Sequence, residues 1–554
     1  MLTPASGRIS IVLTCVWAVC VGVAEGAPRP GNMYTSLEQM NHLFVFDKLV
    51  GELLILLPQS IPEASRYLES YWSVSADREK VKGEVTSVEI TGNPLHVYSV
   101  IKRLVLYWPV LSNLVNISHT LDVVCEDKNV GCKEWSLRGE CLHNWQYMIL
   151  NCQHSCDICL TPEILARVRE VVEASNRTVL PTYDDLRGAA FALARLQRTY
   201  RIPIGSFMHG RLENTPCSVR LTVEDCVRVA NATRHFCYIS DAWLWYSYCR
   251  ATAVDDPLLQ AHIQALMDDT ALQHDRGWSE YNNQYFPRPL NETHYQISRD
   301  SPYSQLCRGT SQQTDGSLRC HVSNRGAHYL TLQPVRYEHV YNQPDIFLFY
   351  DVISDKEIRI IQEQASSLLV RSTVVNKNPY TEARVSQTAW LKNGSHPALL
   401  NVARRIAYVT GLFVFEGPIQ ERAGEELQVL NYGIGGHYDE HMDVFYKGLQ
   451  EGSWNQSLVY EKEFPAGDRI ATWIFYLTDV KSGGRTAFVN AGISVPAVKG
   501  AAAFWYNLKK NGNADFRTQH GGCPVLLGNK WVANKWIREH KNFLRRPCST
   551  NPEE

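Results

Sequence analysis

The hydrophobic pattern of this chain becomes β-rich from about residue 337 onward. Before that point apolar residues recur three or four positions apart, as between residues 37 and 57, which is the spacing of an amphipathic helix. After it, short apolar segments are separated by glycine-rich turns, the pattern of a β-sandwich or jelly-roll barrel. A chain of 554 residues also exceeds the size of one ordinary domain. We therefore predict a multidomain α+β protein with its strands in the C-terminal region.

Local signals place the expected elements more closely. Helices are predicted from the capping-box start at Thr35, over residues 96–115, from Thr182 to about residue 200, from Thr222, and over residues 243–248, 258–272, 355–369 and 397–410. Strands are predicted over residues 426–432, 469–479, 501–508 and 530–536. Residues 287–317 are rich in Pro, Asn, Ser and Gly, which is typical of a linker or loop.

The first residues indicate the compartment. A basic start at Arg8, an apolar stretch over residues 9–23 and the small-residue exit Ala24-Glu25-Gly26 predict a cleaved secretory signal of residues 1–26; a signal anchor is the alternative. No later apolar run is long enough to span a membrane. With 55 Lys and Arg against 57 Asp and Glu, the chain has no charge excess that would favour binding to nucleic acid.

Cysteine usage agrees with an oxidising lumen. Fourteen of the 16 cysteines remain after the predicted cleavage, and six of these lie between residues 125 and 159. A zinc site at Cys156 and Cys159 competes with a disulfide scaffold, which we favour; spacing alone leaves 15 pairings open. Six glycosylation sequons point the same way, at Asn116, Asn176, Asn231, Asn291, Asn393 and Asn455. The C-terminal residues are not an ER-retention tetrapeptide, so retention would need another device.

The segment from His437 to Asp443 is the densest cluster of metal-ligand residue types in the chain. Residues i and i+2 of a strand point the same way, so His-x-Asp aims an imidazole and a carboxylate at one point. Two histidines and one carboxylate are the ligands of non-haem Fe(II) oxygenases, and His520 is the best-placed third ligand. Lys530 follows on an apolar strand, an expensive place for an ammonium unless it binds an anion such as the distal carboxylate of 2-oxoglutarate. Both His437-x-Asp439 and His441-x-Asp443 fit, and spacing does not choose between them.

Two stretches of the chain resemble known families. The six cysteines, with Trp135, Gly139, Asn144 and Ser155 between them, resemble the ShK toxin-like domain. The C-terminal region resembles the catalytic domain of the collagen prolyl 4-hydroxylase α subunit, through residues 351–355, 386–391, 426–436, 469–473, 503–508 and 523–532. Residues 34–40, 102–115, 188–200, 221–226 and 304–309 extend this resemblance upstream, so that it covers nearly all of the mature chain except the cysteine-rich insert.

The resemblance implies roles for individual residues. It assigns His441, Asp443 and His520 as iron ligands, because the family places its ligand histidine nine residues after the tyrosine that here is Tyr432. Lys530 and Tyr432 would contact 2-oxoglutarate, whereas His437 would be a rim residue and Trp505 either a cosubstrate contact or core. The implied disulfides are Cys125–Cys159, Cys132–Cys152, Cys141–Cys156, Cys307–Cys320 and Cys523–Cys548; the pairing of Cys217, Cys226, Cys237 and Cys249 stays open.

The implied fold is a helical N-terminal region and a tetratricopeptide-like peptide-binding region, a small disulfide-rich insert, and a C-terminal double-stranded β-helix, or jelly roll. The expected boundaries are 27–124 for the N-terminal helical, dimerisation-type region, 125–159 for the ShK-like domain and 160–205 for the helical continuation. The next regions are the peptide-binding domain, 206–285, and a linker containing a disulfide, 286–336. The catalytic domain follows at 337–554, and its oxygenase core is about 423–539.

The implied activity is hydroxylation of proline in X-Pro-Gly sequences to 4-hydroxyproline, coupled to conversion of 2-oxoglutarate and O2 to succinate and CO2. Fe(II) and L-ascorbate are the implied cofactors, protein disulfide isomerase the partner in an α2β2-type tetramer, and the endoplasmic reticulum lumen the location. Two alternatives remain: a 2-oxoglutarate hydroxylase acting on another Pro-rich secreted protein, and a non-catalytic secreted peptide-binding protein. An intact set of iron ligands argues against the second alternative.

Overall fold

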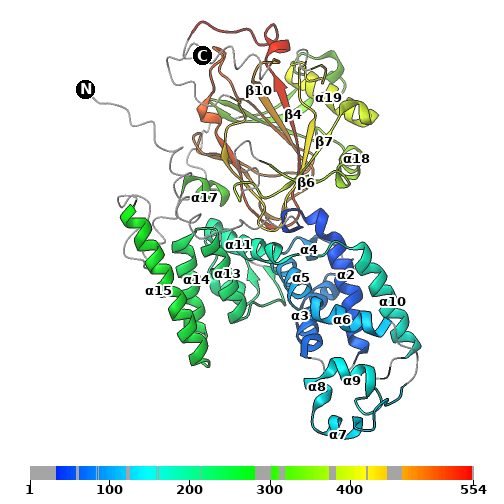
Figure 1. Cartoon of the computed structure of the whole chain (residues 1–554). Coiled ribbons are helices and arrows are strands. Elements are labelled where there is room, and N and C mark those ends of the chain that lie inside the picture. The colour runs from blue at the N-terminus through cyan, green and yellow to red at the C-terminus, as the bar shows by residue number, and fades with distance from the viewer. Residues whose placement is uncertain are drawn as a thin grey trace. The chain divides into compact units, whose positions relative to one another are not determined.

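The computed structural model describes residues 33–57, 62–82, 84, 86–119, 125–157, 159, 161–213, 215–280, 301–310, 319–373, 382–418, 422–445 and 465–551. The predicted signal peptide and the glycosylation candidates Asn291 and Asn455 lie outside these residues. The chain forms two compact units, which Figure 1 shows in blue to green and in green to red. Unit 1 comprises residues up to 298 except 35–39, and unit 2 comprises residues 35–39 and 299–554.

Unit 1 is built from helices. Its first part contains most of α2 (Leu37–Leu56), then α3 (Pro62–Lys80), α4 (Val88–Thr91), α5 (Pro94–Leu106), α6 (Trp108–His119) and α10 (Pro162–Arg177). The predicted helix over residues 96–115 is in fact two helices, because α5 ends at Leu106 and Pro109 occupies the first turn of α6. A buried ion pair between Asp47 of α2 and Arg103 of α5 joins two of these helices.

The second part of unit 1 is a series of helices with short connections. It contains α11 (Tyr183–Tyr200), α12 (Ile204–Met208), the small hairpin β1 (Arg211–Leu212) and β2 (Thr215–Pro216), then α13 (Val223–His235), α14 (Ile239–Thr252) and α15 (Pro257–Glu280). Capping boxes begin α11 at Thr182 and α13 at Thr222, as predicted. The helices α13, α14 and α15 pack in sequence, and a disulfide between Cys226 and Cys249 joins the first two.

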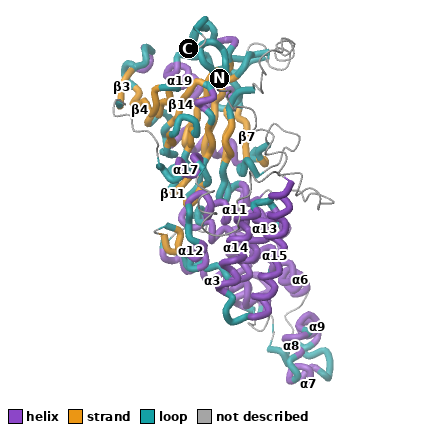
Figure 2. The backbone as a smooth tube through the Cα atoms, turned by 90° about the vertical axis from the view of Figure 1, so that its left-hand side faces the viewer, coloured by secondary structure: helices purple, strands orange, loops and turns teal. Residues whose placement is uncertain are grey.

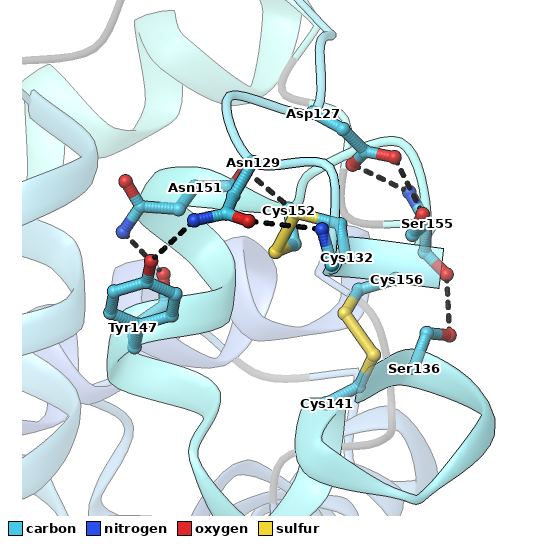
Figure 3. Close-up of a disulfide and its surroundings, with 11 residues drawn as sticks. Asp127, Asn129, Cys132, Ser136, Cys141, Tyr147, Asn151, Cys152, Ser155 and Cys156 are labelled. Carbon is cyan, nitrogen blue, oxygen red and sulfur yellow. Dashed lines mark hydrogen bonds between the residues drawn. A yellow bond between two sulfur atoms is a disulfide. The ribbon is translucent and has the colours of Figure 1, made fainter. Parts of the chain in front are cut away.

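The cysteine-rich insert of unit 1 has three short helices, α7 (Cys132–Leu137), α8 (Glu140–His143) and α9 (Trp145–Asn151). The pairings Cys125–Cys159, Cys132–Cys152 and Cys141–Cys156 are all confirmed. Figure 3 shows Cys141–Cys156 beside the hydrogen bonds from Ser155 to the Asp127 carboxylate. The buried centre of the insert consists of Cys132, Met148 and Cys152. The core of this domain is therefore small and is formed largely by disulfide-bonded cysteines.

The described part of unit 2 contains a large and a small antiparallel sheet and one separate two-stranded pair, and its strands are drawn in orange in Figure 2. The large sheet has nine strands in the order β3-β4-β5-β14-β10-β17-β8-β7-β6. These are β3 (Cys320–Ser323), β4 (Val335–Asn342), β5 (Asp345–Tyr350), β6 (Val370–Arg371), β7 (Gln387–Leu391), β8 (Leu427–Asn431), β10 (Arg469–Tyr476), β14 (Ala502–Tyr506) and β17 (Trp531–Arg538). The small sheet has the order β13-β12-β15-β9, and its strands are β9 (Tyr438–His441), β12 (Thr486–Phe488), β13 (Ile493–Val495) and β15 (His520–Gly522).

Apolar side chains cover both faces of the large sheet. One cluster joins it to the small sheet through residues such as Tyr432, Trp505 and Phe488. The other joins it to α18 (Asp355–Ser366) and α19 (Pro397–Thr410), which lie beside the sheet in Figure 1. Short strands β11 (Ser482–Gly483) and β16 (Val525–Leu527) form a separate pair. This arrangement is the predicted jelly roll, and the space between the two sheets is where the candidate site lies.

The predicted linker of residues 286–336 is partly wrong. Its residues 286–300 and 311–318 lie outside the described parts of the chain, but α17 (Pro302–Cys307) and β3 belong to unit 2. The Tyr303 hydroxyl in α17 donates to the Gly522 carbonyl at 2.9 Å. This contact places Cys307 next to Cys523, and these two cysteines form a disulfide.

The predicted disulfides Cys307–Cys320 and Cys523–Cys548 are therefore wrong, because Cys307 and Cys523 already pair with each other. Cys320 and Cys548 are exposed free thiols in the structure. Spacing along the chain could not reveal this pairing, since it joins positions 216 residues apart.

The exposure of the predicted glycosylation asparagines differs from one site to another. Asn116, Asn176 and Asn231 are exposed, whereas Asn393 is buried and its side-chain oxygen accepts from the Lys535 ammonium. The burial of its amide nitrogen counts against glycosylation at Asn393, since a glycan needs an exposed one. None of the helices described is long and apolar enough to cross a membrane.

Candidate iron and 2-oxoglutarate site

The three predicted iron ligands meet between neighbouring strands of the small sheet. His441 ends β9, Asp443 follows two residues later, and His520 begins β15. Strands β9 and β15 pair antiparallel with His520 opposite His441, so the pairing itself brings the two imidazoles together. One ligand atom of each residue lies within 4.8 Å of the others.

A register shift explains why the other His-x-Asp pair is not part of this group. The pairing of β9 and β15 is irregular between His520 and Gly522, which breaks the strict alternation of side chains. As a result Tyr438 stacks on His441, with ring centroids 3.6 Å apart. His437 instead pairs with Asp439 at 3.1 Å and is buried, so the prediction that it is a rim residue is wrong.

The hydrogen bonds of the two histidines point their free nitrogens at a common centre. Nδ1 of His441 lies 2.7 Å from the Asp439 carbonyl oxygen, and Nδ1 of His520 lies 3.0 Å from that of Thr518. Each Nδ1 therefore donates a proton to a carbonyl, and each Nε2 keeps its lone pair. The two Nε2 atoms lie 3.7 and 3.6 Å from the Asp443 carboxylate oxygens, which leaves room for an ion between them.

The electrostatics of this group suit a divalent cation. Burial and the neighbouring His520 lower the pKa of His441 well below its ordinary value, so its imidazole is neutral and free to bind a metal. Burial alone would raise the pKa of Asp443, but His520 and His441 outweigh it and hold the pKa low. Two imidazoles and one carboxylate are the ligand set of non-haem Fe(II) oxygenases, and the group of His441, Asp443 and His520 fits iron.

Thr472 is a supporting residue that the sequence did not single out. Its hydroxyl, on β10, donates to Oδ2 of Asp443 at 2.8 Å, and the Asn507 amide donates to that hydroxyl in turn. These two consecutive hydrogen bonds orient the Asp443 carboxylate toward the two histidines. The sequence signal for Thr472 was a polar residue in the otherwise apolar part of β10. This signal does not say which partner the hydroxyl has.

Lys530 is buried, and no acidic side chain pairs with it in the described part of unit 2. Only 2% of the residue is exposed, and no carboxylate in the described parts of unit 2 lies within ion-pair distance of its Nζ. Burial lowers the pKa of Lys530 to about 7. A buried ammonium is costly unless an anion pairs with it, so this position fits a ligand that brings its own carboxylate.

Tyr432 lies beside Lys530, whose Nζ is 4.9 Å from the tyrosine ring centroid. Its hydroxyl lies near Gly522, which is two residues from His520 on β15. Tyr432 therefore lies between the lysine and the strand that carries a candidate ligand. Trp505 contacts the His520 ring edge-on with centroids 4.7 Å apart, and Phe488 contacts Trp505 in turn. These rings form an apolar wall beside the candidate metal site.

Comparison with known proteins agrees with this site. A family model described as the 2OG-Fe(II) oxygenase superfamily matches residues 427–538, which include all four of His441, Asp443, His520 and Lys530. A second model, described as ShK domain-like, matches residues 124–159.

Similarity to whole proteins extends over most of the chain. Prolyl 4-hydroxylase subunit alpha-3 from Mus musculus is 36% identical over 433 residues, which cover 68% of this chain and 77% of that protein. Prolyl 4-hydroxylase subunit alpha-1 from Homo sapiens is 30% identical over 591 aligned positions, covering 96% and 98% of the two chains. The C-terminal domain is accordingly that of an Fe(II)- and 2-oxoglutarate-dependent dioxygenase, and the chain belongs to the prolyl 4-hydroxylase α-subunit family.

Proposed function

We propose that this chain is the catalytic subunit of a prolyl 4-hydroxylase that acts on proline in X-Pro-Gly sequences of collagen-like polypeptides. One observation carries the proposal: the ligand group of His441, Asp443 and His520 lies in the same barrel as a buried lysine, Lys530, beside which the described residues of unit 2 place no counter-ion. The first group holds Fe(II), and Lys530 binds the distal carboxylate of 2-oxoglutarate. Membership of the prolyl 4-hydroxylase family supports proline as the target.

The chain's own residues do four things in this reaction. His441, Asp443 and His520 hold the metal on one side and leave its other side for the cosubstrate and O2. Thr472 fixes the carboxylate, Lys530 orients 2-oxoglutarate, and Trp505 excludes water from one side of the site. When bound, iron and 2-oxoglutarate supply the oxidising chemistry that places a hydroxyl group on C4 of proline. L-Ascorbate would return to the ferrous state any iron that is oxidised without product.

A peptide comparison tests the substrate class. Purified enzyme with iron, 2-oxoglutarate and ascorbate should convert proline to 4-hydroxyproline in a peptide of Pro-Pro-Gly repeats, as measured by mass spectrometry with fragmentation. A Pro-rich peptide without glycine serves as the matched control and should remain largely unmodified. Equal or preferred hydroxylation of that control would favour the alternative, a hydroxylase of another Pro-rich secreted protein.

The helices from α11 to α15 are proposed as the tetratricopeptide-like peptide-binding region. The half-buried Trp243 and Tyr248 of α14 offer aromatic surface of the kind that binds polyproline II helices. Trp245 and Tyr246, which lie between them, are fully buried and belong to the core. Replacing Trp243 with Ala should therefore raise the KM for a long peptide more than for a single Pro-Pro-Gly triplet. An equal change for both peptides would argue against this region.

We also propose that the enzyme works in the endoplasmic reticulum lumen, in an α2β2-type complex with protein disulfide isomerase. The predicted secretory signal, three confirmed disulfides in the insert and exposed sequons at Asn116 and Asn176 support this location. Co-expression with protein disulfide isomerase should give a soluble complex retained in the lumen. Retained, soluble and active enzyme from the single chain would contradict the partner.

A further inference from the structure

A second group of ligand-type side chains lies in unit 1, far along the sequence from the candidate iron site. Asp77 is in the last turn of α3, His96 is in the first turn of α5, and Cys217 directly follows β2. One ligand atom of each lies within 4.8 Å of the others, and all three residues are buried. Cys217 forms no disulfide. A carboxylate, an imidazole and a thiol thus converge from three separate elements.

His96 has the hydrogen-bond arrangement of a metal-binding histidine. Its Nδ1 lies 3.0 Å from the Ile90 carbonyl oxygen and donates to it. Its Nε2 faces Oδ2 of Asp77 at 2.9 Å. A main-chain carbonyl on one ring nitrogen fixes the ring and directs the other nitrogen at the metal, and His441 and His520 show the same pattern in unit 2.

The position of Cys217 is fixed by its own backbone. Its main-chain N–H donates to the Gly210 carbonyl at 2.7 Å. Gly210 has φ of +67°, and a Cβ there would lie against the carbonyl oxygens of Cys217 and Val219. The segment therefore packs closely on Gly210, and this contact fixes the backbone that carries the sulfur.

Asp77 is oriented in the same way. Its Oδ2 accepts from the Ser218 N–H at 2.6 Å, and its Oδ1 accepts from the Ser218 hydroxyl at 2.6 Å and from the Lys80 ammonium at 3.0 Å. Hydrogen bonds of this kind hold a ligating carboxylate in position. All three candidate ligands are therefore oriented by partners outside the group, as expected of a prepared site rather than of a chance contact.

We propose that Asp77, His96 and Cys217 bind a zinc ion that joins α3, α5 and the segment after β2. Zinc accepts sulfur, nitrogen and oxygen ligands together in a tetrahedron, with bonds of about 2.0–2.3 Å. Ligand atoms in such a tetrahedron lie about 3.5 Å apart, which a small adjustment of this group achieves. Water completes the four ligands. One ion replaces the protons that His96 and Cys217 otherwise direct at the Asp77 carboxylate, and it balances the thiolate and the carboxylate.

Cobalt substitution tests the proposal in the full-length chain. Cobalt(II) bound to a thiolate gives an intense charge-transfer absorption in the near ultraviolet, whereas the candidate iron site contains no cysteine and cannot give it. Full-length protein loaded with cobalt(II) should show this absorption, and zinc should abolish it. Metal analysis of protein loaded with zinc should find one more zinc ion per chain than in Cys217→Ser.

Controls separate zinc binding from general folding effects. Cys320→Ser removes an exposed thiol and should keep both the cobalt absorption and the zinc ion. His96→Asn should weaken zinc binding while leaving Cys217 in place. If wild-type protein gives no thiolate absorption and its melting temperature does not rise on adding zinc, the proposal is wrong; this holds even if the variants fail to fold.

Discussion

The buried charge of Lys530 destabilises the free protein and is the reason we expect this residue to bind an anion. The folded chain buries its ammonium without a counter-ion in the described part of unit 2, and a carboxylate from 2-oxoglutarate would remove that defect. Lys530→Ala should therefore weaken 2-oxoglutarate binding by on the order of 2–5 kcal/mol while iron still binds. The KM for 2-oxoglutarate, measured at fixed peptide concentration, checks this. Lys499→Ala removes an exposed lysine and should change nothing. An unchanged KM in Lys530→Ala would refute the assignment.

The pH dependence of 2-oxoglutarate binding follows from the same residue. Burial lowers the pKa of Lys530 to about 7, and a bound carboxylate favours the ammonium and raises it again. Binding therefore takes up a proton above pH 7, so the Kd should be constant below about pH 7 and should rise by up to about tenfold per pH unit above it. Isothermal calorimetry of the iron-loaded enzyme without O2 measures this. Lys530→Arg keeps its charge at every pH and should show no such rise; a flat profile in the wild type would contradict the argument.

The two His-x-Asp pairs provide a matched comparison. His441→Ala should lose tightly bound iron and essentially all turnover, because it removes one of three converging ligands. His437→Gln should keep most of both, since His437 pairs with Asp439 outside that group. Iron content after gel filtration and succinate release measure the two effects. The opposite behaviour of the two variants would place the iron centre four residues earlier in the chain.

Residue chemistry predicted the ligand group well and its surroundings less well. Ligand type pointed to residues 437–443 and to His520, and the family resemblance, through the distance from Tyr432, chose His441 and Asp443. The structure brings His441, Asp443 and His520 together. The burial of His437 could not be predicted, because it depends on an irregular pairing of β9 with β15. The role of Thr472 depends on a contact between positions 29 residues apart. Neither of these contacts can be derived from the local sequence alone.

At the scale of elements, the disulfide between Cys226 and Cys249 links α13 to α14. Both cysteines are fully buried, and the sequence separation of 23 predicts about 3 kcal/mol of stabilisation from the shorter loop in the unfolded chain. Cys226→Ala with Cys249→Ala should lower the melting temperature by roughly 6–10 °C. Differential scanning calorimetry measures it, with Cys320→Ser as the control. An unchanged melting temperature would show that this bond does not stabilise unit 1.

Element boundaries were predictable where local chemistry sets them. Capping boxes at Thr182, Thr222 and Ser354 begin helices, and α19 begins and ends at the predicted residues. The disulfides of the insert followed from its family resemblance. The pairing of Cys307 with Cys523 did not, because it requires knowing that α17 packs beside β12 in the barrel. Long-range packing, rather than local preference, decided this pairing.

At the scale of the whole molecule, the change of pattern near residue 337 correctly separated helical from strand-rich sequence. The boundary of unit 2 lies earlier, at residue 299, because α17 and β3 are attached to the barrel by a disulfide and by strand pairing. The chain therefore combines a helical unit, which carries the ShK-like insert and the proposed zinc site, with an oxygenase unit. Chemistry is assigned to the second unit alone.

The most direct test of this assignment counts two products in one reaction. Wild-type enzyme, incubated with iron, 2-oxoglutarate, O2 and Pro-Pro-Gly peptide, should form succinate and 4-hydroxyproline in nearly equal amounts. His441→Ala should form neither, because the metal no longer has its three ligands. Succinate without 4-hydroxyproline in the wild type would keep the oxygenase but remove proline as its target. Formation of 4-hydroxyproline by His441→Ala at the wild-type rate would contradict the iron site itself.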